Sequence, residues 1–199
     1  MAFTTYADLQ TDIASWLARD DLTDNIPDFI TLFEAVAARK MKVRLQQVRV
    51  TLTPSSGSVA LPSDYLSWIR LTWTGSLRRD LQYAHPSYIQ EHYPDNPSAN
   101  PNYFTIEGST ITVAPSDDTA LDFLYNQKTA AVSTALNWIW TNHPDLYLAG
   151  AMFEAAKFTK DPDAIQLWKP QRDEIFGEIQ LMDFKAAGTL AISVEGPTP

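Results

Sequence analysis

The sequence predicts an α+β fold in which N- and C-terminal helix pairs form a helical bundle that carries an inserted antiparallel β-rich module. Apolar residues recur at helical spacing near both ends of the chain, whereas the middle third alternates apolar and polar residues. Each terminal helix pair is too small to bury its own apolar stripe, so the two pairs are expected to pack together. We therefore expect a helical domain of residues 1–46 and 141–187, a β-rich domain of residues 47–140 and an extended C-terminal tail of residues 188–199.

The first helix pair is predicted by two apolar stripes. The first helix, residues 6–18, has Thr5 as its expected N-cap. The second begins around Pro27, which the first turn of a helix tolerates, and is expected to continue to about residue 45. The stripe of the first helix is Leu9, Ile13, Trp16 and Leu17, and that of the second is Ile26, Ile30, Phe33, Ala37 and Met41.

The middle of the chain is predicted to be β-rich because its apolar residues change to a period of two. Turn residues separate the short runs, and Glu107-Gly108 is expected at the tip of a hairpin. A short helix over residues 86–92 interrupts the strands. The expected strands cover residues 48–53, 59–61, 68–73, 103–106, 111–113 and 121–125.

The second helix pair begins at His143-Pro144-Asp145, where Pro and Asp both favour the first turn of a helix. This helix should end before Asp161-Pro162-Asp163, and a second helix should follow to about residue 187. Pro170 is expected to kink that last helix or to delay its regular part.

Composition excludes several classes of function. The 199 residues contain no Cys, which excludes disulfides, thiolate zinc sites and cysteine nucleophiles. A net charge of −9 is unlike that of a duplex-DNA-binding protein. No apolar run approaches the roughly 20 residues of a membrane span. The N-terminus has no basic segment followed by an apolar one, so we expect no secretory signal and a cytoplasmic protein.

No motif predicts catalysis or cofactor binding. The three histidines, His85, His92 and His143, have no metal-ligand spacing, and no glycine-rich phosphate loop or nucleophile elbow occurs. A hydrolase that uses His143 and Asp145 is a weak alternative, because the same residues are typical of a helix start. We therefore expect no enzyme activity, no metal site and no cofactor.

Two groups of residues are candidates for interaction surfaces. Trp138 and Trp140 lie two residues apart and would share a strand face, where an exposed aromatic pair would suit a carbohydrate-binding module. Five of the 15 basic residues lie within eleven positions that contain no acidic residue. This basic strip is either a solvated helix end, whose cations complement the helix dipole, or a subunit or partner interface. The strip consists of Arg39, Lys40, Lys42, Arg44 and Arg49.

A resemblance favours the interface. Residues 137–148, NWIWTNHPDLYL, are followed by Ala151, Glu154-Ala155-Ala156 and Lys160-Asp161. The other segments are residues 26–30 (IPDFI) with Arg39 and Arg44, 61–65 (LPSDY), 85–88 (HPSY), 103–108 (YFTIEG) and 113–115 (VAP). In order and spacing, these segments resemble the head-to-tail adaptor proteins of tailed bacteriophages, over roughly residues 6–187.

The resemblance implies a non-enzymatic virion protein at the head-tail junction, assembled in the bacterial cytoplasm. Its copies would form a ring, twelve-fold by resemblance, beneath the portal protein. The ring would extend the DNA channel for genome ejection without binding DNA specifically, and would attach a downstream tail or nozzle protein. The family's C-terminal segment commonly reaches onto the portal, a role that would fall here on residues 188–199 with Leu190, Ile192 and Val194. A carbohydrate-binding β-rich module of a tail or surface protein is the alternative function.

Overall fold

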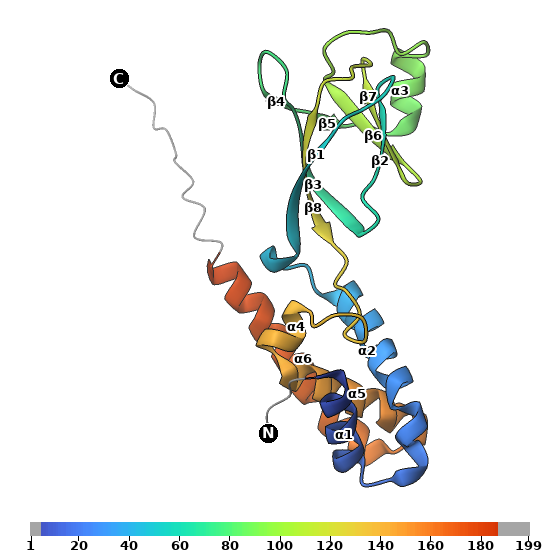
Figure 1. The fold of residues 1–199 in the computed structure, drawn as a ribbon, viewed down its shortest axis with the longest axis vertical. Coiled ribbons are helices and arrows are strands. Elements are labelled where there is room, and N and C mark those ends of the chain that lie inside the picture. The colour runs from blue at the N-terminus through green and yellow to red at the C-terminus, as the bar shows by residue number, and fades with distance from the viewer. Residues whose placement is uncertain (1–4, 187–199) are drawn as a thin grey trace, which may run out of the picture. The chain divides into compact units, whose positions relative to one another are not determined.

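A computed structural model describes residues 5–186, which form two compact units (Figure 1). One unit is helical and draws its described residues from 1–43 and 129–199, and the other is the β-rich segment Arg44–Lys128. The α+β class is confirmed, with helices at both ends and antiparallel strand pairs between them. None of the helices in the described part of the chain is both long and apolar enough to cross a membrane.

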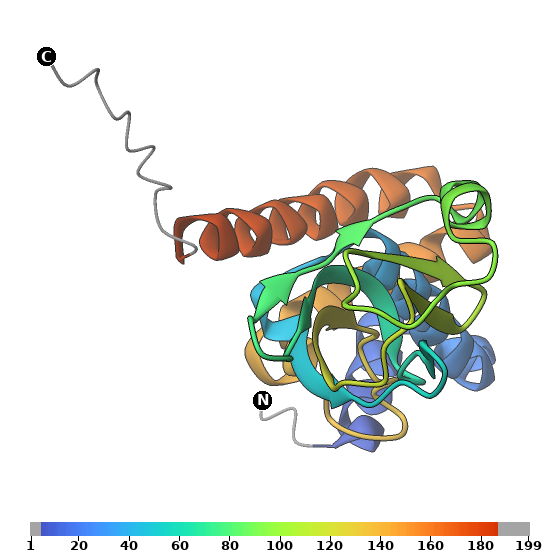
Figure 2. The same cartoon turned by 90° about the horizontal axis from the view of Figure 1, so that it is seen from above.

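The helical unit follows the predicted pattern of caps and stripes. Its elements are α1 (Tyr6–Leu17), the 3-10 helix η1 (Asp20–Asn25), α2 (Ile26–Lys40), α4 (Trp138–Asn142), α5 (Pro144–Thr159) and α6 (Pro162–Ala186). Thr5 caps α1 in a capping box, since its side chain accepts from the Asp8 N–H and the Asp8 carboxylate accepts from the Thr5 N–H. Pro170 lies inside α6, and Figure 2 shows α6 as one long helix.

The end of α2 differs from the prediction. This helix stops at Lys40 rather than near residue 45, and Met41 has an extended backbone (φ −103°, ψ 126°). Met41 and Val43 are nonetheless buried in the helical core. Apolar residues therefore continue the stripe after the helix itself has ended, because extended backbone buries every second side chain.

The core of the helical unit lies between α2, α5 and α6. The Phe33 and Tyr147 rings meet edge to face with centroids 5.2 Å apart, and Phe176 lies beyond Phe33 at 6.3 Å. Gly150 permits this close approach, because a Cβ there would lie 2.0 Å from Cδ2 of Phe33. Residues 129–140 also belong to this unit, since Val132, Ile139 and Trp140 are part of the same core.

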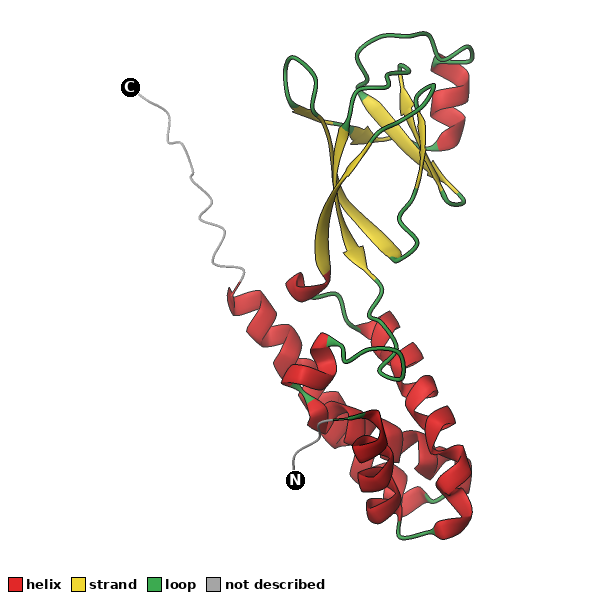
Figure 3. Cartoon of the chain, in the orientation of Figure 1, coloured by secondary structure: helices red, strands yellow, loops and turns green. Residues whose placement is uncertain are grey.

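The β-rich unit contains two four-stranded sheets and one short helix, α3 (Pro86–His92) (Figure 3). The first sheet has the strand order β1-β8-β3-β4 and the second β2-β7-β6-β5. The 3-10 helix η2 (Arg44–Gln46) precedes β1. The strands are β1 (Gln47–Leu52), β2 (Ser58–Ala60), β3 (Tyr65–Trp73), β4 (Arg79–Asp80), β5 (Gln82–Tyr83), β6 (Tyr103–Glu107), β7 (Thr110–Ala114) and β8 (Leu121–Gln127).

The inner faces of the two sheets share one core. Leu121, Phe123 and Tyr125 of β8 point inward and join Phe104 of β6 and Val113 of β7. The predicted hairpin at residues 107–108 is confirmed, with Glu107 paired to Thr110 and Gly108 at φ 58°. The pairing of β5 with β6 is parallel, whereas the other pairs of named strands in the described residues are antiparallel. Asp122 and Leu124 point to the outer face of the first sheet, where a group of arginines lies.

Candidate functional site

The basic strip is divided between the two units. Arg39, Lys40 and Lys42 belong to the helical unit, whereas Arg44 and Arg49 belong to the β-rich unit. All five residues are exposed. Since α2 ends at Lys40, only Arg39 and Lys40 occupy its last turn, where cations complement the helix dipole.

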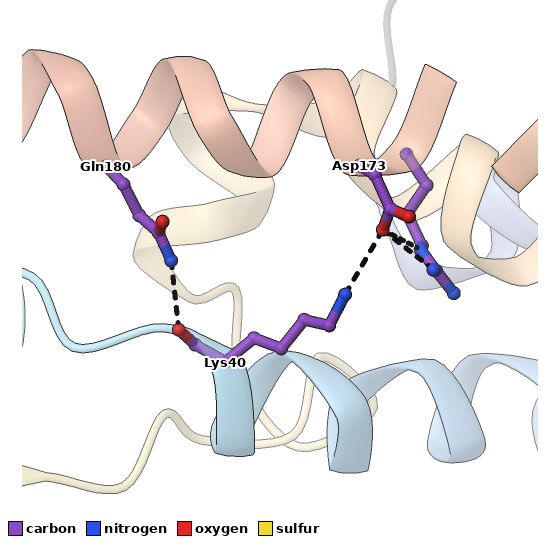
Figure 4. A network of polar contacts seen from close by, with 4 residues as sticks. Lys40, Asp173 and Gln180 are labelled. Carbon is purple, nitrogen blue, oxygen red and sulfur yellow. Dashed lines mark hydrogen bonds and ion pairs between the residues drawn. The ribbon is translucent and has the colours of Figure 1, made fainter. Parts of the chain in front are cut away.

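Lys40 is held within its own unit (Figure 4). Its Nζ lies 3.1 Å from Oδ1 of Asp173 on α6, and its backbone carbonyl accepts from Nε2 of Gln180 at 3.1 Å. Arg172 also donates to Asp173, with its Nη2 2.7 Å from the same oxygen. Burial opposes ionisation of Asp173, but the hydrogen bonds from Arg172 and Lys40 outweigh it and lower the pKa of Asp173 below its usual value. Lys40 therefore joins α2 to α6 rather than being free for a partner.

Arg39 and Lys42 have no such role. Neither side chain forms an ion pair or hydrogen bond with another residue in 5–186. They are the members of the basic strip in the helical unit whose cationic groups remain available to a partner.

Arg49 belongs to a second basic group, which we call the arginine hollow. This hollow on the outer face of the first sheet has a volume of about 460 Å³. Four of the chain's arginines line it, although the chain as a whole is acidic. Its lining residues are Arg49, Arg70, Thr72, Arg78, Arg79 and Asp80.

Sequence reasoning missed three of the four arginines in this hollow. Arg70 lies on β3, and Arg78-Arg79 precede and begin β4, so no local run of basic residues marks them. The sequence did contain one indication, because Arg49 and Arg70 each lie within a predicted strand at a position that should point away from the core. Their proximity, however, depends on β8 inserting between β1 and β3, so that Arg49 and Arg70 both pair with Leu124.

The expected exposed pair of tryptophans is wrong. Trp138 and Trp140 lie in helix α4, where residues two apart do not share a face. Trp140 is 3% exposed and packs edge to face on Tyr147 with centroids 5.7 Å apart, whereas Trp138 is half-buried. The carbohydrate-binding alternative depended on this pair, and the structure does not provide it as a platform.

The three histidines have local contacts. Nδ1 of His85 accepts from the Ser87 N–H at the start of α3, and the His92 ring stacks on Tyr88 at 4.1 Å. His143 immediately precedes α5, whose first turn contains Pro144 and Asp145, so the predicted helix start is confirmed. Within residues 5–186, no group of three or more His, Asp or Glu side chains is arranged to hold a metal ion.

The helical unit also has an open hollow of about 480 Å³ between α1, α5 and α6. Trp16 and Trp168 line it and meet edge to face at 5.7 Å, and Trp16 is 54% exposed. The expected tail contacts Leu190, Ile192 and Val194 lie outside the described residues.

Residues 4–192 match the family model described as SU10 adaptor protein. The match covers both the helical and the β-rich segments of the sequence. No curated protein matches the sequence at a significant level.

Proposed function

Because the chain belongs to the SU10 adaptor protein family, a family of phage structural adaptors, we propose that it joins the head of a tailed bacteriophage to its tail. The match over residues 4–192 is the observation that carries this proposal. The family implies a virion component that associates with portal and tail proteins. The multi-segment resemblance in the sequence points to the same role.

In this role, copies of the chain form a ring beneath the portal, with twelve copies in a complete ring. The ring extends the DNA channel and offers the surface on which a tail or nozzle protein assembles. It acts through protein contacts, without a catalytic step or a cofactor, and is assembled in the host cytoplasm.

The charge of the chain supports a passage for DNA. Cationic walls would bind DNA phosphates by releasing counterions, and each such contact would slow DNA that has to slide past. A net charge of −9 per copy disfavours that adhesion. The basic groups of an otherwise acidic chain are then available for contacts between proteins.

Arg39 and Lys42 support a protein interface at the basic strip, because their exposed cationic groups are not used within the described residues. We leave Lys40 out of this interface, because its Nζ forms an ion pair with Asp173. We also propose Arg44, which belongs to the β-rich unit, as a residue of a subunit or portal contact. The tail, residues 188–199, contributes Leu190, Ile192 and Val194 to the portal contact.

The test is the mass of purified portal particles with and without the full-length chain, measured by native mass spectrometry. We expect a portal complex whose added mass corresponds to a ring of chains. The variant Arg39→Glu with Lys42→Glu should place fewer chains on each portal particle than the wild type does. Added salt should make the numbers of bound chains of the variant and the wild type more alike, because it screens the charges. The matched control is Lys160→Glu with Lys169→Glu, which reverses two exposed cations elsewhere in the helical unit and makes the same charge change. A chain that does not bind portal particles, or that is found in virions only on the capsid shell or fibres, would contradict the proposal.

A further inference from the structure

The arginine hollow is built by the pairing register of the first sheet. Arg49 on β1 and Arg70 on β3 flank Leu124 of the intervening strand from its two sides. Thr72 pairs with both Asp122 and Asp80, which brings two carboxylates to the same outer face. Residues paired across antiparallel strands point to the same side of the sheet, so the side chains of Arg49 and Arg70 face the same direction.

Asp80 and Asp122 form ion pairs with arginines of the hollow but leave most of their guanidinium N–H groups without a hydrogen-bond acceptor in the described part of the chain. Asp122 forms ion pairs with Arg78 and with Nε of Arg49, the latter at 3.6 Å. Asp80 accepts from the Thr72 hydroxyl at 2.6 Å, and its Oδ1 lies 3.9 Å from Nε of Arg70. The distances to Arg49 and Arg70 are too long for hydrogen bonds. Four cations against two carboxylates also leave the hollow positively charged.

Most of the guanidinium donors are therefore unused. Each arginine carries five N–H donors. Among the described residues, the Arg49, Arg70 and Arg79 side chains donate no hydrogen bond, and Nε of Arg79 is buried without a partner. The Arg79 guanidinium stacks on the Trp73 ring at 5.1 Å, which fixes its position. The hollow thus presents several oriented donors to a ligand that carries more than one anionic oxygen.

We propose that the arginine hollow binds carboxylate side chains from the helical unit of a second copy of this chain. This inference adds a specific subunit contact to the proposed function and rests on it for its setting. The helical unit has 16 acidic against 9 basic residues, so one copy's acidic unit complements the other's hollow. Its 3-10 helix η1 exposes Asp20 and Asp24, whereas the Asp21 carboxylate between them already accepts two hydrogen bonds from Arg19.

A second copy fits the hollow better than a nucleic acid does. Asp80 and Asp122 lie among the arginines and would repel a continuous phosphate backbone. A few carboxylates held by bidentate hydrogen bonds need only a local positive site of this size. Because the contact joins two different surfaces of the chain, it is compatible with a head-to-tail arrangement of copies, which forms a ring when the rotation between copies closes.

The experiment compares Arg70→Glu with Lys128→Glu, which makes the same charge change at an exposed position of the same unit outside the hollow. Self-association of the full chain is measured by sedimentation equilibrium from about 0.05 M to about 0.5 M NaCl. Arg70→Glu should lower the association constant at least about tenfold at low salt, whereas Lys128→Glu should change it less than about twofold. Arg70→Gln and Arg70→Lys, checked for folding by circular dichroism, separate loss of charge from loss of the planar fork.

Each outcome decides the inference. Equal effects of Arg70→Glu and Lys128→Glu, or a wild-type chain that does not self-associate either free or on portal particles, would overturn it. So would loss of binding to a short DNA duplex in Arg70→Glu with self-association unchanged. A failure of the wild type to bind portal would contradict the proposed function instead, because self-association in free solution is measured without portal.

Discussion

A buried polar network gives the sharpest prediction about stability. The Tyr147 hydroxyl donates to Oε1 of Glu34 at 2.8 Å and accepts from Nδ2 of Asn137 at 2.6 Å. Glu34 also accepts from the Val132 N–H at 2.7 Å, and Asn137 donates to the Ala130 carbonyl at 2.7 Å. The network thereby fastens α2 and α5 to the segment that enters α4. The substitution Tyr147→Phe removes its central hydroxyl and keeps the ring that packs on Phe33.

The expected cost follows from the two lost bonds. A hydrogen bond to a carboxylate contributes about 2 kcal/mol and one between neutral groups about 1 kcal/mol. Glu34 and Asn137 each keep another partner, so neither is completely unsatisfied after the change. We expect Tyr147→Phe to lower the free energy of unfolding of the helical unit by about 2 to 3 kcal/mol. At about 2 to 4 °C per kcal/mol, its melting temperature should fall by about 4 to 12 °C.

The assay is urea unfolding followed by the circular dichroism of the helices. Tyr83→Phe is the control, because Tyr83 is 44% exposed and its hydroxyl has no hydrogen-bond partner among the described residues. It should change stability by less than about 0.5 kcal/mol. If Tyr147→Phe is also within about 0.5 kcal/mol of the wild type, the network does not stabilise the unit as argued.

Three further predictions concern other parts of the structure. Gly150→Ala should destabilise the helical unit in thermal unfolding although Ala favours helices, because its Cβ would lie 2.0 Å from the Phe33 ring; a higher melting temperature would contradict this. Lys40→Ala should cost at most about 1 kcal/mol in urea unfolding, since its ion pair with Asp173 is exposed; a larger loss would show that the contact is stronger than its exposure implies. Burial raises the pKa of Tyr125 to about 12 from 10.0, so the stability that its protonated form provides is complete below pH 10.0 and is lost as the pH rises through about 12. Tyr125→Phe should make the alkaline decline in stability shallower over that range, and an unchanged pH profile would refute the assignment.

Local chemistry made most of the helical ends and strands predictable. The starts of α1, α2 and α5 depend on residues that are neighbours in the chain: Thr5 with Asp8, Pro27, and His143-Pro144. The sequence alone was therefore sufficient to predict these helix starts. Helix α2 was predicted too long because Met41 continues the apolar stripe by spacing. Met41 is buried because it packs on the core from extended backbone, and the spacing of apolar residues cannot distinguish this from a buried position within a helix.

The tryptophan pair failed for a related reason. Trp138 and Trp140 follow a β-rich segment, so a period of two was assigned to residues that form a short helix. Asn137 caps that helix by accepting from the Trp140 N–H at 3.0 Å, and its amide also binds Tyr147. The Asn137 cap was readable in the sequence. Its partnership with Tyr147 was not, because it depends on how α5 packs.

The arginine hollow shows why net charge is a poor guide to a surface. A total of −9 predicts repulsion from any anion, yet the fold brings four arginines around one hollow, two of them through strand pairing. Asp122 is only 13% exposed and already restrains Arg49 and Arg78. A partner carboxylate would therefore meet side chains that have lost part of their conformational entropy on folding, which reduces the entropic cost of association. Asp122 thus lowers the positive charge of the hollow and at the same time holds Arg49 and Arg78 ready for a partner carboxylate. The variant Asp122→Asn should therefore make the hollow more positive and still weaken the binding of a second copy, because Arg49 and Arg78 would be less restrained.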